Sequence, residues 1–215
     1  MVLQHLGQKF SDRSVVTVKD SNFLKAHNAK HLWHPMAHPA EMQAKPPAII
    51  TGGEGCVIKD INGAHLIDAV GGLWNVNLGY SCEPVKQAIT DQLNDLPYYS
   101  IFRGTTNDKI IELSEVLRDF FAPEGMVRSF FTSGGSDSVE IALRLARQYH
   151  KLRGEPGRIK YLSLKKGYHG THTGSASVNG NANFRTQYEP LMPGCFHIPA
   201  PYTYRNPFNE TDPKA

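Results

Sequence analysis

The 215-residue sequence has no long apolar run anywhere along its length. A helix needs about 20 consecutive apolar residues to cross a bilayer, so no transmembrane helix is predicted. The N-terminal residues MVLQHLGQKFSDRS also lack the continuous apolar region of a secretory signal peptide. These absences predict a cytoplasmic protein with no membrane partner.

The sequence also has no large excess of charge of either sign, and it has few cysteines. The chain carries 23 basic and 20 acidic side chains, a formal net charge of +3, spread along its length. This balance gives no electrostatic reason to expect a nucleic-acid partner. The three cysteines, Cys56, Cys82 and Cys195, are far apart and form no CxxC motif, so free thiols are predicted rather than disulfides or a zinc site.

Turn-forming residues are abundant, with 19 glycines and 14 prolines, as expected where strands and helices alternate. Residues up to about Pro47 predict a short helix and an ordered arm. Two segments of alternating polarity, 56–60 and 64–68, predict a hairpin whose Asn62-Gly63 pair suits a type I′ turn. Because one hairpin is not stable alone, it is predicted to belong to a small lobe.

The rest of the chain alternates between helical and strand periods. Apolar residues recur at helical spacing in residues 84–96 and 108–121, the second with Asn107 as its N-cap. Residues 127–132 predict a short buried strand that leads through a glycine-rich turn into a long helix, 137–152, and residues 159–164 predict the next strand. This order is typical of a parallel α/β sheet with right-handed crossovers.

The segment FFTSGGSDSVE, residues 130–140, places a glycine pair and Ser136 between a predicted strand and a predicted helix. Such a loop exposes backbone N–H groups at the positive end of the helix, where a phosphate can bind. It is neither a Walker loop nor a dinucleotide-binding motif, because the required lysine and glycine spacings are absent. Taken alone, it is equally consistent with a phosphate site and with a tight turn.

The segment KKGYHGTHTG, residues 165–174, follows the next predicted strand. Ligands of open parallel sheets bind outside the carboxyl ends of the strands, so Tyr168 and His169 are predicted to face the same crevice as the glycine pair. An aromatic ring beside a phosphate site suits a flat cofactor ring. A core tyrosine and a loop histidine are the alternative for this pair alone.

Five segments together carry a more specific signal: HLWHP (31–35), GLWNVNLGY (72–80), FFTSGGSDSVEIALRLAR (130–147), GYHG (167–170) and IPAPYTYR (198–205). In their order and approximate spacing they resemble the class III, fold-type-I pyridoxal 5′-phosphate (PLP) aminotransferases, particularly the beta-alanine–pyruvate and omega-amine group. The resemblance implies an α/β fold, the large domain of the fold-type-I PLP-dependent transferases, with a parallel-rich sheet flanked by helices. Residues 1–70 would form an N-terminal arm and part of a small lobe, and residues 71–215 the first, truncated part of the PLP-binding domain.

The resemblance also implies a cofactor site. Gly135 and Ser136 would hold the PLP phosphate through a backbone N–H and a hydroxyl, with Gly134 in the same loop at a position where many members have serine. Tyr168 would stack on the pyridine ring, with His169 beside it. Asp137 stands where the family often has glutamate, which keeps the charge and changes the reach.

For the substrate, the resemblance places Leu73 and Trp74 in the pocket. Phe102 would reach the pocket of a partner subunit, because family active sites form at a dimer interface, and a homodimer or homotetramer is implied. The implied reaction moves an amino group from an omega-amino acid or amine to a keto acid such as pyruvate. An aminomutase or decarboxylase of the same fold type, or an inactive fragment with an assembly role, are the alternatives.

The family's Schiff-base lysine and the aspartate that pairs with the pyridine nitrogen match regions beyond Ala215, so no catalytic residue is assigned within this chain. Lys165 and Lys166 are interpreted as a solvated basic pair and not as replacements. Thr211-Asp212-Pro213 is typical of a helix start, and only Lys214 and Ala215 follow it, so we expect a truncated polypeptide.

Two other patterns point to different chemistry. Four histidines, His27, His31, His34 and His38, have the spacing of helical metal ligands, but Pro35 and Pro39 interrupt any helix through them, so no metal site is predicted. A hydrolase built on Ser136 and His169 is remote, because the sequence lacks the G-x-S-x-G motif of a nucleophile elbow.

Overall fold

The computed structural model describes residues 20–209, 211 and 212, and it divides into two compact units, one ending at Ser100 and the other beginning at Ile101. The division predicted at residue 70 stays a prediction. The predicted helix start at residues 211–213 includes Pro213, which lies outside the described residues.

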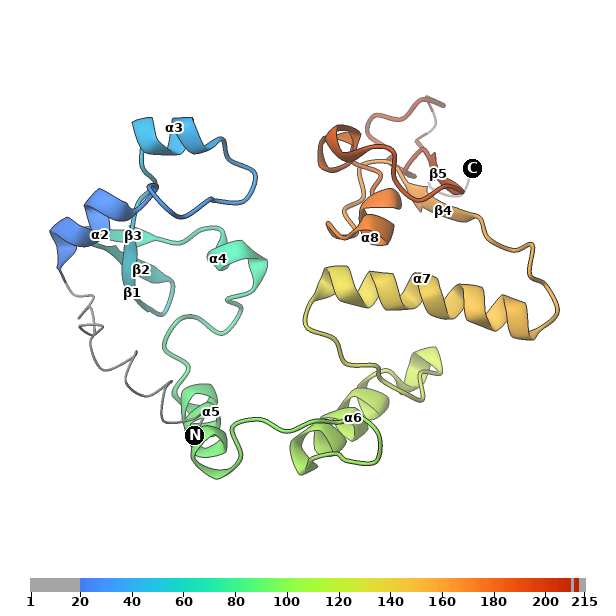
Figure 1. Ribbon diagram of the computed structural model, residues 1–215, viewed down its shortest axis with the longest axis horizontal. Coiled ribbons are helices and arrows are strands. Elements are labelled where there is room, and N and C mark those ends of the chain that lie inside the picture. Colours follow the sequence, from blue (N-terminus) through green and yellow to red (C-terminus); the bar gives the residue numbers. More distant parts are fainter. Residues whose placement is uncertain (1–19, 210, 213–215) are drawn as a thin grey trace, which may run out of the picture. The chain divides into compact units, whose positions relative to one another are not determined.

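The first unit contains a three-stranded antiparallel sheet in the order β1 (Ile50–Glu54), β2 (Val57–Asp60) and β3 (His65–Ile67) (Figure 1). β2 and β3 form the predicted hairpin. β1 was not predicted; it pairs with the other edge of β2, with an irregular register between Ile50 and Gly52. Glycine is depleted in strands, so the Gly52-Gly53 pair hid this strand from a propensity argument.

The turn of the hairpin is not the predicted type I′, which requires positive φ at both central residues. Gly63 has φ +89°, but Asn62 does not have positive φ. The Asp60 carboxylate instead accepts the N–H groups of Asn62 at 2.9 Å and Ala64 at 2.8 Å. The aspartate before the Asn-Gly pair therefore organises a longer connection than the one predicted.

The helices of the first unit are α2 (Ser21–His27), α3 (Pro39–Ala44), the short turn α4 (Gly71–Trp74) and α5 (Glu83–Asp95). α5 confirms the helix predicted around Pro84, which occupies its first turn. α3 begins at Pro39, so the histidine-rich segment is not one continuous helix. Residues 20–209 with 211 and 212 contain no group of three or more His, Cys, Asp or Glu side chains placed to hold a metal.

The second unit contains α6 (Asp108–Phe120), α7 (Gly135–Leu152), α8 (Thr173–Ser177) and the parallel strands β4 (Tyr161–Leu164) and β5 (Cys195–Ile198). The predicted helices and the parallel sheet are confirmed, and Asn107 caps α6 by accepting the Ile110 N–H at 3.0 Å. Short 3-10 helices complete the unit at η1 (Ala122–Glu124), η2 (Ala182–Phe184) and η3 (Thr186–Tyr188).

The strand predicted at residues 127–132 is wrong: the segment has no regular secondary structure and is largely exposed. A strand exists only where a neighbour completes its hydrogen-bond ladder. Within the described part of the chain, the ladder of the second unit joins β4 to β5 alone. An apolar, β-prone segment therefore stays unpaired here, and its sequence could not show that.

Burial in the described chain is concentrated in α8 and the residues that follow it. Ala176 and Val178 are buried there together with the polar residues Ser175, Ser177 and Asn179. Large apolar side chains of α5, α6 and β4 are exposed. Among the helices that the structure describes, none combines the length and the apolar character needed to pass through a membrane. Cys56, Cys82 and Cys195 are free thiols, as predicted.

Candidate functional site

The N-terminal end of α7 is open to an anion. Gly134 occupies the N-cap position and supplies no side-chain hydrogen bond to the first turn. A Cβ placed on Gly135 would meet nothing within 4 Å, so there is open space beside this residue. The first N–H groups of a helix have no partner within the helix, and the positive end of its dipole lies there. An 18-residue helix with this end uncovered suits a phosphate.

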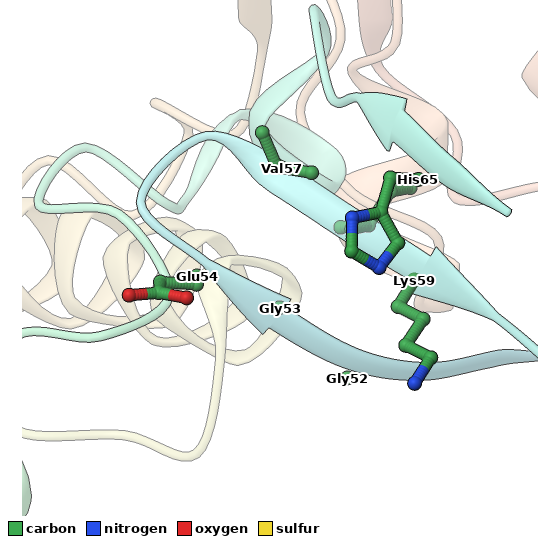
Figure 2. Close-up of a pocket in the computed structure, with 7 residues that line it drawn as sticks. Gly52, Gly53, Glu54, Val57, Lys59 and His65 are labelled. Atoms are coloured by element: carbon green, nitrogen blue, oxygen red, sulfur yellow. The ribbon is translucent and has the colours of Figure 1, made fainter. Parts of the chain in front are cut away.

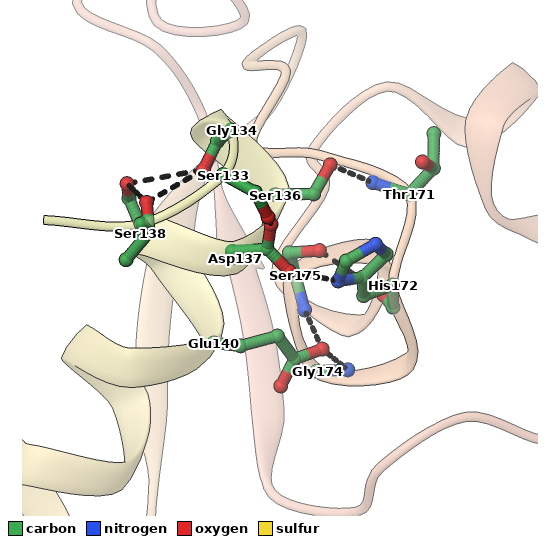
Figure 3. Close-up of polar contacts among 11 residues, drawn as sticks. Ser133, Gly134, Ser136, Asp137, Ser138, Glu140, Thr171, His172, Gly174 and Ser175 are labelled. Atoms are coloured by element: carbon green, nitrogen blue, oxygen red, sulfur yellow. Dashed lines mark hydrogen bonds and ion pairs between the residues drawn. The ribbon is translucent and has the colours of Figure 1, made fainter. Parts of the chain in front are cut away.

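Ser136 connects this helix end to the loop after β4. Its Oγ accepts a hydrogen bond from the Thr171 N–H at 3.1 Å (Figure 3). A hydroxyl that accepts in this way keeps its own proton to donate to another acceptor. Gly170 lies directly against it, since a Cβ there would be 2.7 Å from Ser136 Oγ. The two motifs that the sequence predicted to meet are therefore in contact.

Tyr168 and His169 lie in the loop formed by residues 167–181. Tyr168 is 57% exposed, and its ring makes an edge-to-face contact with Phe184, at 5.0 Å between centroids. His169 is half-buried, and its backbone N–H donates to Asn179 Oδ1 at 2.5 Å. An exposed tyrosine beside backbone that is held by Asn179 is consistent with stacking on a flat ligand, a role that stays a prediction.

Two side chains that hold the 167–181 loop were missed by the sequence argument. Glu140 of α7 accepts the N–H groups of Gly174 at 2.6 Å and Ser175 at 3.2 Å (Figure 3). Asn179 is buried and contacts the backbone of His169 and Gly170. A signal existed for Glu140, because it is the one charged residue between Val139 and Leu143, but its partners could not be named.

Asp137 also reaches the loop, through an ion pair with His172 at 3.2 Å between Oδ1 and Nδ1. The same carboxylate accepts a hydrogen bond from the Ser133 hydroxyl. Both contacts are visible at the start of α7 in Figure 3. Asp137 thus ties the loop before the helix to the loop after β4.

In the first unit, Asp68 organises the turn made of residues 68–74, which we call the Asp68 turn. Its carboxylate accepts the Tyr80 hydroxyl and, at 2.6–3.1 Å, three consecutive backbone N–H groups, those of Val70, Gly71 and Gly72. The hydrogen bond from Tyr80, followed by that from the Gly72 N–H, lowers the pKa of Asp68. The same bond to Asp68 is the largest cause of the raised pKa of Tyr80. The turn therefore carries a carboxylate that is charged at neutral pH.

The Asp68 turn presents two of the predicted pocket residues. Leu73 and Trp74 are 83% and 86% exposed, and Trp74 has φ +61°, a conformation that is costly for a bulky residue. The third, Phe102, belongs to the second unit, is 72% exposed and carries the Arg103 guanidinium 5.4 Å above its ring. These side chains are available to a ligand or a partner surface.

Lys165 and Lys166 are both exposed at the end of β4. Lys166 has φ +70°, and its Nζ lies 4.6 Å from the centre of the Tyr202 ring. This cation–π contact directs the amine to the segment after β5.

An open depression on the β1–β3 sheet is lined by Gly52, Gly53, Glu54, Val57, Ile58, Lys59 and His65. Lys59 and His65 are cross-strand partners, and Glu54 lies away from them at the other end (Figure 2). None of the predicted cofactor or pocket residues lines it. The best-supported site of the chain is therefore the α7 end with the 167–181 loop.

Comparison with known proteins identifies the family of the chain. Residues 39–215 match the family described as aminotransferase class III. The chain is 35% identical over 191 residues to the putrescine–pyruvate aminotransferase of Pseudomonas aeruginosa, covering 89% of this chain and 42% of that protein. It is also 35% identical over 196 residues to the adenosylmethionine-8-amino-7-oxononanoate aminotransferase of Methanocaldococcus jannaschii, covering 90% and 42%.

Solved structures give the same result. An amine transaminase from an uncultivated Pseudomonas species, in its PLP-bound form, shares 45% identity at a TM-score of 0.81, covering 86% of this chain and 41% of that one. An (S)-enantioselective omega-transaminase from Thermomicrobium roseum shares 33% identity at a TM-score of 0.83, with coverage of 86% and 41%. The predicted fold-type-I class is confirmed. The chain spans about two fifths of the length of these relatives, and it belongs to the class III aminotransferase family.

Proposed function

We propose that this chain supplies the phosphate site and part of the substrate pocket of a PLP-dependent aminotransferase. One observation carries the proposal: the Tyr168–Gly170 segment lies against the uncovered N-terminal turn of α7, with Gly170 in contact with Ser136. The hydrogen-bond donors for a phosphate and an exposed aromatic residue therefore lie in the same part of the structure. The PLP-bound Pseudomonas relative supports the choice of cofactor.

The residues present fit a phosphorylated pyridine ring. Gly135 offers its backbone N–H at an open helix end, and Ser136 offers a hydroxyl proton, because its acceptor side is engaged with Thr171. Gly134 contributes no hydroxyl, so this loop has one donor fewer than a serine there would give. Tyr168 offers a ring face, with His169 beside it. When bound, PLP supplies an electron-accepting ring, and these residues bind and orient it.

The substrates that we propose are an amine or omega-amino acid as donor and a keto acid such as pyruvate as acceptor. The names of the relatives, among them a putrescine–pyruvate aminotransferase and several omega-transaminases, support this class. Leu73 and Trp74 would shape the pocket, and Phe102 would enter the pocket of a partner subunit in a homodimer. The exposure of all three side chains is consistent with these roles.

We also propose that neither Lys165 nor Lys166 is the Schiff-base lysine of such an enzyme. Lys165 and Lys166 are the lysines nearest to Tyr168 in sequence, and the amine of Lys166 is engaged at the Tyr202 ring. A Schiff-base lysine must bring its amine to the reacting carbonyl carbon. The contact of the Lys166 amine with the Tyr202 ring does not favour that position.

Ser136→Ala in a full-length polypeptide that includes these residues tests the phosphate site. One hydrogen bond to a charged group is worth about 1.5–3 kcal/mol, so the affinity for PLP should fall roughly tenfold or more. Activity at saturating cofactor should change little. The measurement is a titration of the protein with PLP, with protein fluorescence as the signal.

The matched control is Ser114→Ala in α6. The Ser114 hydroxyl donates to Ile111 O of its own helix at 2.7 Å and contacts none of the predicted cofactor residues, so its loss should leave PLP affinity unchanged. An unchanged dissociation constant in Ser136→Ala would mean that Ser136 serves only to hold Thr171.

A further inference from the structure

The 167–181 loop is closed at its base by main-chain contacts. Gly167 O accepts the N–H groups of Gly180 at 3.0 Å and Asn181 at 3.1 Å. Gly180 lies so close to the end of β4 that a Cβ there would be 1.8 Å from Leu164 O. The loop therefore leaves β4 and returns to it, carrying Tyr168 and His169 on its outgoing limb.

Asn179 holds that outgoing limb from inside the loop. It is fully buried, at 0% exposure. Its Oδ1 accepts the His169 N–H at 2.5 Å, and its Nδ2 donates to Gly170 O at 2.7 Å. The short amide side chain offers an acceptor and a donor from two separate atoms, which an ionised aspartate does not because it cannot donate. A buried backbone group left without its partner is costly, so these bonds fix the limb.

Glu140 holds the same loop from α7. Its Oε1 accepts the N–H groups of Gly174 and Ser175 at the start of α8, whose far end leads into Asn179. The fit is close, since a Cβ on Gly174 would be 2.5 Å from Glu140 Oε2. Glu140 lies one turn after Ser136, on the helix whose open end is the proposed phosphate site.

We propose that Glu140 and Asn179 are positioning residues that set the Tyr168 ring at a fixed height above the phosphate site. This inference rests on the proposed function. Glu140 transmits the position of α7 to α8, and Asn179 transmits the position of α8 to the His169–Gly170 backbone. Neither side chain contacts the open end of α7 itself, so both act through Tyr168 and Ser136.

The test compares Glu140→Ala, Glu140→Gln and Asn179→Ala in a full-length polypeptide that includes these residues. Glu140→Ala and Asn179→Ala should weaken PLP binding roughly tenfold or more, since each removes two hydrogen bonds from the loop. They should also change the circular dichroism of the bound cofactor, which reports the ring's asymmetric environment. Glu140→Gln keeps an oxygen that can accept both N–H groups, so it should restore most of the affinity and the dichroic band.

Glu155→Ala is the matched control. Glu155 pairs with His150 at 2.9 Å and with Arg158 at 3.4 Å after the far end of α7, so its loss can destabilise the unit without touching the loop. PLP affinity and dichroism should stay at the wild-type values. Amide hydrogen exchange of residues 167–181, measured without cofactor, should rise in Glu140→Ala and Asn179→Ala and not in Glu155→Ala.

The outcomes separate the two claims. If the wild-type polypeptide binds no PLP, the proposed function fails, and the positioning role fails with it. If the wild type binds PLP and the Glu140→Ala and Asn179→Ala variants match it in affinity and dichroism, the proposed function stands and the positioning role is overturned. Faster loop exchange with unchanged affinity and dichroism would assign the two residues to stability alone.

Discussion

The Asp68 turn and the 167–181 loop are both held by a carboxylate, but the two carboxylates take their partners from different distances along the chain. Each follows a strand, and in each a carboxylate accepts consecutive backbone N–H groups. Asp68 takes its partners from within 12 residues, whereas Glu140 reaches partners 34 and 35 residues away. The first turn can form from local sequence, and the second exists only where α7 and the loop are packed together.

The difference extends to burial. The Asp68 turn carries exposed side chains, Leu73 and Trp74, on a backbone that is itself largely exposed. The 167–181 loop contains the most buried residues of the described chain, at 174–179, and it exposes Tyr168 and residues 171–173. A locally framed turn suits a pocket wall, and a loop fixed from two elements suits the orientation of a cofactor ring.

The 215-residue polypeptide on its own gives the largest expected effect. Its α7, β4 and β5 carry exposed apolar side chains, and unpaired strand edges and apolar faces promote association. We expect no cooperative melting transition and no amine-dependent formation of alanine from pyruvate with added PLP. Size-exclusion chromatography, thermal melting and the coupled assay measure this. A cooperative monomer with turnover would contradict both the packing argument and the assignment of Lys165 and Lys166.

Gly180→Ala should damage the 167–181 loop and leave the Asp68 turn intact. A Cβ at position 180 would overlap Leu164 O, and forcing atoms into a packed site costs about 1–3 kcal/mol or more. We expect a lower Tm and weaker PLP binding in a full-length polypeptide. Gly157→Ala is the control, because a Cβ there meets nothing within 4 Å. Equal Tm values for the two variants would show that the loop shifts to accommodate the added Cβ at little cost.

Trp74→Ala should alter substrate choice and spare the cofactor. Removing a wall of an apolar pocket changes the preference between a bulky and a small amine by roughly tenfold to a hundredfold. The measurement is kcat/KM on both amines alongside PLP occupancy in a full-length polypeptide. Loss of bound PLP, or an equal fall in kcat/KM on both amines, would mean that Trp74 only stabilises the turn. The Asp68 turn would then not differ from the 167–181 loop in serving substrate choice.

Tyr80→Phe should give the smallest change. The Tyr80 hydroxyl is the largest cause of the lowered pKa of Asp68, so its removal should raise that pKa toward the ordinary 3.8. The folded-state pKa lies below 3.8, so the stabilisation by Asp68 is fully present well above pH 3.8 and is lost as the pH falls through the folded value. NMR titration of the Asp68 carboxyl carbon measures the shift. No shift would mean that the backbone N–H groups alone hold the carboxylate.

Local sequence was sufficient for the helices and for part of the site. The apolar period and Asn107 predicted α6. The prediction that the glycine pair and the GYHG segment face one crevice agrees with the contact between Ser136 and Thr171, although the strand expected before Ser136 is absent. The Asn-Gly pair predicted a hairpin but not its turn, because Asp60 offered a competing set of hydrogen bonds.

Elements that depend on distant partners could not be predicted in this way. Residues 127–132 have strand composition and no strand beside them, and β1 has a poor strand composition with a good partner in β2. Glu140 and Asn179 are ordinary residues in the sequence, and their roles arise from contacts that only the folded chain creates. The pocket roles of Leu73, Trp74 and Phe102 stay predictions.

The close fit between Glu140 and Gly174 restricts which amino acids relatives of this chain can carry at these two positions. Every replacement of a glycine by another amino acid adds at least a Cβ, and at position 174 that atom would collide with the Glu140 carboxylate. A shorter acid at position 140 would relieve the collision and leave the two N–H groups less well satisfied. The two positions should therefore not drift independently, and aligned relatives should show a side chain at 174 chiefly where position 140 is shorter.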